Sequence, residues 1–137
     1  MILSRIAVVA VVALLSSPVS AAGIDGCAPM QRLIQQARND FPSLRSLKMQ
    51  PGVCTLRAAE YKCRWAFPGD AFGAAETQTE ALVQCAAAKS GAAPQKRKRG
   101  EIAIALESDL SLIVDQPEID SGQWLVRLRI VSEPAAD

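Results

Sequence analysis

Apolar and polar residues alternate strictly in two segments of the chain, and each segment predicts a strand with one buried and one solvated face. In residues 60–67 the odd-numbered positions are Tyr, Cys, Trp and Phe, while the even-numbered ones include Lys62 and Arg64. In residues 124–131 the even-numbered positions are apolar, and the odd-numbered ones include Arg127 and Arg129. We therefore expect four cations on the solvated faces of these two strands.

Other patterns predict two helices and further strands. Apolar residues three and four apart predict an amphipathic helix over 28–40, which Pro42 ends. The Ala-, Glu- and Gln-rich segment 74–89 predicts a second helix with a narrow apolar face of small residues. Short apolar runs predict strands over 44–49, 53–57, 102–106 and 110–114, and we interpret residues 115–122 as a loop.

These elements predict an α+β fold. Tight turns between consecutive strands favour antiparallel pairing, and two helices can then cover one face of the sheet. The prediction is two helices on one face of a mainly antiparallel sheet of about five to six strands. The other face would be solvated.

The first 22 residues have the pattern of a secretory signal peptide. Arg5 precedes an unbroken apolar run over 6–15, and small residues follow at 16–22. The run is shorter than the ~20 residues that span a bilayer. We expect a leader over 1–22, a single domain over 23–137 without a transmembrane segment, and an exported protein that is periplasmic or secreted.

Four cysteines behind an export signal predict two disulfides, for which three pairings exist. A tight hairpin around Ala58-Ala59 would place Cys54 opposite Cys63 at a pair that is not hydrogen-bonded, which favours that bridge. Cys27 would then pair with Cys85. Their spacing contains no C-x₂₋₄-C unit, so we expect no metal site.

Charge is segregated along the chain although the formal net charge is only +1. Residues 32–99 contain 12 Lys or Arg and 5 Asp or Glu, whereas residues 100–137 contain 2 and 8. A near-neutral total argues against a nucleic-acid binder. The basic residues culminate in the consecutive cations Lys96, Arg97, Lys98 and Arg99. Such a run favours an anionic partner, or a solvated loop that keeps an edge strand from pairing with other chains.

The sequence offers little for catalysis. It has no histidine, and it lacks phosphate-binding, dinucleotide-binding and Gly-x-Ser-x-Gly motifs. Carboxylates remain as candidates, and they lie in two predicted turns or loops: Glu107, Asp109, Asp115, Glu118 and Asp120. We assign no catalytic residue and no cofactor.

The leading hypothesis is a small exported, non-catalytic binding or accessory module that contacts a protein or an anionic cell-envelope component. Its candidate binding residues are the basic run 96–99 and the strand cations Lys62, Arg64, Arg127 and Arg129. Two alternatives stay open: a small envelope hydrolase that uses carboxylates, and a secreted enzyme inhibitor.

Overall fold

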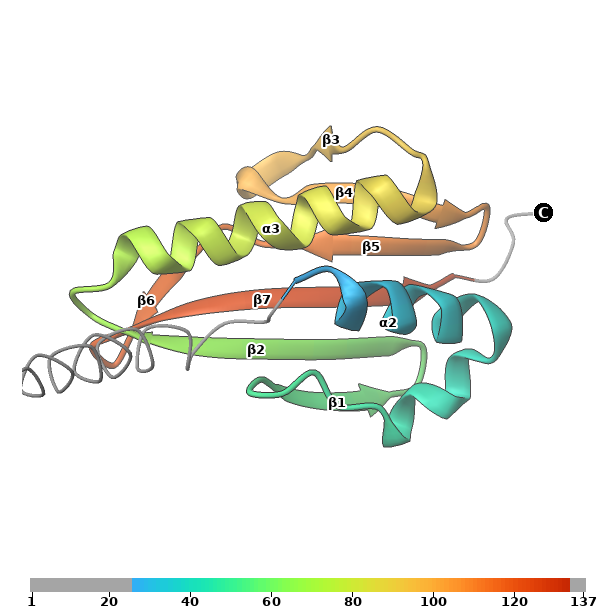
Figure 1. The fold of residues 1–137 in the computed structure, drawn as a ribbon, viewed down its shortest axis with the longest axis horizontal. Coiled ribbons are helices and arrows are strands. Elements are labelled where there is room, and N and C mark those ends of the chain that lie inside the picture. The colour runs from blue at the N-terminus through green and yellow to red at the C-terminus, as the bar shows by residue number, and fades with distance from the viewer. Residues whose placement is uncertain (1–25, 134–137) are drawn as a thin grey trace, which may run out of the picture.

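Two helices lie on one face of an antiparallel sheet in the computed structural model, which describes residues 26–133 (Figure 1). The predicted leader over 1–22 lies outside the described residues. The sheet has seven strands, of which two contain only two and three residues. The α+β prediction is therefore confirmed.

The sheet is built from two hairpins that meet at its longest strand, β7. Its order is β1 (Val53–Arg57), β2 (Glu60–Pro68), β7 (Gln123–Ser132), β5 (Leu110–Val114), β4 (Ile102–Glu107) and β3 (Gln95–Lys96). The short strand β6 (Glu118–Asp120) continues the line of β5 along the same side of β7. All these pairs are antiparallel.

Helix α2 (Ala28–Asn39) buries Met30, Leu33, Ile34 and Ala37 against the sheet, as its spacing predicts. Helix α3 (Phe72–Ser90) lies across β4, β5 and β7 (Figure 1). Its buried residues include Ala75, Leu82 and Ala86, so small side chains allow a close approach to the sheet. Gly91 ends α3 in the left-handed conformation, which costs glycine little.

The alternating strands face the helices with their apolar side. Tyr61 and Trp65 of β2 are almost fully buried, and so are Leu128 and Ile130 of β7. In the same strands Lys62 and Arg64 are exposed. The sheet thus has an inner face covered by helices and an outer face that the described residues leave in solvent.

Both predicted disulfides are present. Cys54 and Cys63 are directly opposite each other in the β1–β2 hairpin, with Cα atoms 4.1 Å apart. Cys27 precedes α2 and joins Cys85 of α3, so this bridge ties the two helices together. All four cysteines are oxidised, which removes thiol chemistry from the molecule.

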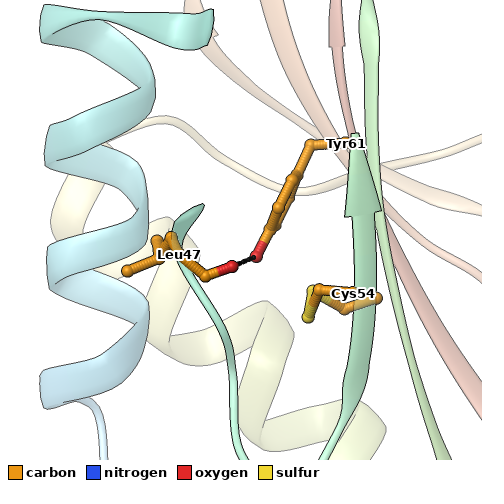
Figure 2. The surroundings of a disulfide bond; sticks show 4 residues. Leu47, Cys54 and Tyr61 are labelled. Atoms are coloured by element: carbon orange, nitrogen blue, oxygen red, sulfur yellow. Dashed lines mark hydrogen bonds between the residues drawn. A yellow bond between two sulfur atoms is a disulfide. The ribbon is translucent and has the colours of Figure 1, made fainter. Parts of the chain in front are cut away.

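Tyr61 fixes the chain that leads into the hairpin. Its hydroxyl donates a hydrogen bond of 2.7 Å to the carbonyl oxygen of Leu47, beside the Cys54 disulfide (Figure 2). Burial of the phenol raises the pKa of Tyr61 from 10.0 to about 12. Tyr61 is therefore protonated near neutral pH and has a structural role.

Two local predictions were wrong. Residues 44–49 do not form a strand, because Pro42 starts a 3₁₀ helix, η3 (Phe41–Ser46), that buries Leu44. The interpretation of residues 115–122 as one loop missed β6. Trp124, at the end of the sheet, is partly buried against the core, and its ring packs on Phe72 at 4.7 Å between centroids.

Candidate binding surface

The four strand cations lie together on the outer face. Lys62 is directly opposite Arg129, and Arg64 is directly opposite Arg127, in the pairing of β2 with β7. The alternation predicted on which face of each strand these cations lie. The pairing register places the two cations of β2 beside the two cations of β7. Four cations in one block would create a strongly positive surface if nothing compensated them.

Arg129 is compensated by three carboxylates from three different parts of the chain. Its Nη2 lies 2.7 Å from Glu101 Oε2 and 3.3 Å from Asp115 Oδ1, and its Nη1 lies 3.8 Å from Glu60 Oε2. The Arg129 side chain is 22% exposed, so solvent screens these ion pairs only in part. Arg129 is therefore the centre of a local ion-pair network.

Two of the other three cations also have acidic partners. Arg127 Nη1 lies 3.0 Å from Glu118 Oε2, and Lys62 Nζ lies 3.9 Å from Glu60 Oε1. Arg64 makes no ion pair or side-chain hydrogen bond within residues 26–133. Arg64 is thus the one cation of β2 and β7 that the described part of the chain leaves uncompensated.

A concavity of about 680 Å³ lies over the ion-pair network. Four acidic and four basic side chains line it: Glu60, Glu101, Asp115, Glu118, Lys62, Arg99, Arg127 and Arg129. Arg99 belongs to the basic run 96–99, so the three strand cations of this concavity face four carboxylates. The predicted basic strip is therefore compensated over most of its length.

The basic run occupies the opposite edge of the sheet from β1. Gln95 and Lys96 form β3, which pairs with Ala103 and Ile102 of β4. Lys98–Gly100 form one 3₁₀ turn, η4, in which Arg99 has a φ of 63°. We call residues 96–99 the basic loop. Its four side chains are exposed, and none has a carboxylate within ion-pair distance among the described residues.

The candidate catalytic carboxylates do not form an acid–base pair. Glu107 and Asp109 are exposed at the β4–β5 turn, and Asp120 is exposed at the β6–β7 turn. Asp115 and Glu118 each face an arginine. A carboxyl group that serves as a general acid needs apolar surroundings, which none of these five has. Among residues 26–133, no group of side chains is arranged to hold a metal ion.

The acidic partners of Arg129 were missed by sequence reasoning. Glu60 is the first outer-face position of the alternating strand β2, but Glu101 lies just before β4 and Asp115 lies where the chain bulges between β5 and β6, so neither of these two belongs to an alternating pattern. The sequence signal that could have pointed to such partners was the excess of acidic residues after position 100, in the segment that also contains Arg127 and Arg129. Only the strand order shows which acids reach which arginine.

Comparison with protein-family models, curated proteins and solved structures finds no match for this chain. No helix within the described residues is long and apolar enough to cross a membrane. The candidate surface therefore rests on the geometry of this chain alone.

Proposed function

We propose that this protein is an exported, non-catalytic binding module that contacts an anionic partner through the basic loop, Lys96–Arg99. The observation that carries this proposal is the contrast in charge compensation. Three of the four strand cations have acidic partners, whereas all four cations of the basic loop have none in the described chain. Uncompensated positive charge is concentrated there.

The loop is also held in place. The β3–β4 pairing fixes its start, and the Arg97 backbone N–H donates a 2.7 Å hydrogen bond to the Glu101 carbonyl. Gly100 follows with a φ of 76°, which lets the chain turn back into β4. A preorganised loop loses less conformational entropy on binding than a free tail. This supports a recognition role beyond the protection of the β4 edge that β3 provides.

Two further observations agree with the proposal. Both disulfides are formed, and disulfides are typical of proteins that fold in oxidising compartments, which supports export. The candidate acids are exposed or paired with arginine, which favours binding over hydrolysis.

The test is a comparison of two fourfold variants with the same change in net charge. One replaces the basic loop by glutamine (Lys96→Gln, Arg97→Gln, Lys98→Gln and Arg99→Gln). The control replaces four exposed cations that lie elsewhere and also lack ion pairs in the described chain (Arg32→Gln, Arg45→Gln, Lys48→Gln and Arg57→Gln).

Binding is measured on anionic phospholipid vesicles, an immobilised anionic polysaccharide and polyglutamate. Each Lys or Arg near an anionic surface contributes ~1 kcal/mol, so the loop variant should bind its preferred probe about a hundredfold more weakly or worse. The control variant should bind nearly as well as the wild type. Equal losses in both variants would show that only net charge matters and would overturn the assignment to the loop.

A further inference from the structure

The two edges of the sheet differ in how far they are protected from pairing with another strand. The β4 edge is covered by β3, and beyond β3 the Arg38 Nη2 donates a 3.2 Å hydrogen bond to the carbonyl oxygen of Leu106. Within the described residues, the β1 edge has neither device. β1 contains no proline, lysine or bulge, which are usual means of preventing an edge strand from pairing, and its one charged residue, Arg57, lies at its end next to the turn.

Backbone groups on the β1 edge point away from the sheet. The 4.1 Å Cα separation of Cys54 and Cys63 identifies a pair that is not hydrogen-bonded, and Leu56 opposite Tyr61 is the next such pair. The N–H and C=O groups of Cys54 and Leu56 therefore face outward. No hydrogen bond from the described residues reaches them.

A groove of about 600 Å³ lies on the outer face next to this edge. Val53, Ala66 and Leu125 give it an apolar floor, and Asp120 and Gln123 add polar groups. Val53 is 58% exposed and is the strand partner of Arg64. The groove thus combines apolar surface with Arg64, an outer-face cation that has no acidic partner in the described chain.

We propose that the β1 edge is a docking site for an extended segment of another protein, which adds to the sheet as a strand and places an acidic side chain on Arg64. The proposal is independent of the basic loop, which lies at the opposite edge. The partner's backbone would pair with Cys54 and Leu56, as in other cases of strand addition. Its outward side chains would lie beside Val53 and Thr55.

The spacing of strands allows the ion pair. A residue opposite Val53 on an added strand lies two strand spacings of ~4.8 Å from Arg64. Glutamate and arginine side chains together span that distance across Val53. A protein segment suits the site better than an acyl chain, because only a peptide backbone satisfies the outward N–H and C=O groups.

The first test is selection from a random peptide display library on the wild-type protein and on Arg64→Glu. We expect peptides with β-branched residues and one acidic residue on the wild type, and a basic residue in its place on Arg64→Glu. Arg32→Glu is the matched control, because Arg32 is an exposed cation of α2 without an ion pair in the described chain and lies away from the β1 edge, and it should select the wild-type peptides. Arg64→Gln, which only removes the charge, should bind the wild-type peptides about tenfold more weakly.

The second test follows the backbone by amide hydrogen exchange with a selected peptide. The Cys54 and Leu56 amides should exchange rapidly in the free protein and at least tenfold more slowly in the complex. Methylation of those peptide nitrogens that would donate to the Cys54 and Leu56 carbonyls should abolish binding. The proposal is overturned if no peptide is selected, if Arg64→Glu selects the same peptides, or if the two amides are unaffected. Concentration-dependent protection of both amides without peptide would also overturn it, because a second copy would then occupy the edge.

Discussion

Arg129 joins three segments that are far apart in the sequence, so its replacement tests the ion-pair network at the scale of one residue. Arg129→Gln would leave Glu60, Glu101 and Asp115 close together without their shared cation. Because the network is partly buried, we expect a loss of about 1–3 kcal/mol in the free energy of unfolding, measured in urea at low salt. Arg64→Gln removes an unpaired cation from the same face and should change this free energy by less than ~0.5 kcal/mol. Equal effects of the two substitutions would contradict the network.

The buried phenol of Tyr61 should make the free energy of unfolding depend on pH under alkaline conditions. The pKa of Tyr61 is about 12 in the folded protein and 10.0 for an exposed phenol, so the folded state holds this proton more tightly. Its contribution to stability is complete below pH 10 and is lost as the pH rises from about 10 to 12. Tyr61→Phe should lack this contribution and should cost about 1 kcal/mol at neutral pH, because the Leu47 carbonyl loses its donor.

The chain has one tyrosine, so tyrosinate absorbance reports this titration without overlap from another phenol. The midpoint should lie near 12 for the folded protein and near 10.0 in denaturant. A midpoint in the folded protein equal to that in denaturant would show that the phenol is not buried.

At the scale of elements, the two disulfides should differ in their contribution to stability. Cys27 and Cys85 are 58 residues apart and join α2 to α3, whereas Cys54 and Cys63 are 9 apart within one hairpin. The chain-entropy model gives about 4.2 kcal/mol for the longer loop and about 2.7 kcal/mol for the shorter one. Urea unfolding of the double alanine variants should show the larger loss for Cys27→Ala/Cys85→Ala. The reverse order would mean that local packing outweighs loop closure.

The sequence alone predicted some of the strands and both disulfides, but not every strand. Strict alternation predicted β2 and β7 together with the face of each residue, because a half-buried strand imposes a period of two. The cysteine spacing and the two-residue turn predicted both bridges. By contrast, β3 and β6 were not predicted, since two or three residues carry no periodic signal and owe their conformation to the neighbouring strand.

The candidate site was predictable only in part for the same reason. The basic loop is contiguous, so the sequence displays it directly. The compensation of Arg127 and Arg129 depends on strand order and on acids from separate segments, and no local pattern encodes it. The open β1 edge likewise depends on strand order, because no other strand of the described chain lies beyond β1 in the sheet.

For the whole molecule, the distribution of compensated charge matters more than the total. A formal charge of +1 suggests no preference for an anion, yet one edge of the sheet carries four cations that have no acidic partner among residues 26–133. Over the ion-pair network beside that edge, four carboxylates compensate the three strand cations Lys62, Arg127 and Arg129. An anionic partner would therefore orient on the basic loop, and the β1 edge would stay available for a second, peptide-like contact.

The most direct test of this account is the salt dependence of binding to the preferred anionic probe. Affinity is measured at rising salt for the wild type, for the basic-loop variant and for the control variant at Arg32, Arg45, Lys48 and Arg57. The account predicts a steep fall of affinity with salt for the wild type and the control, because cations in contact with an anionic surface are screened. The loop variant should show a much shallower dependence. The same slope for all three proteins would contradict a binding role for the basic loop.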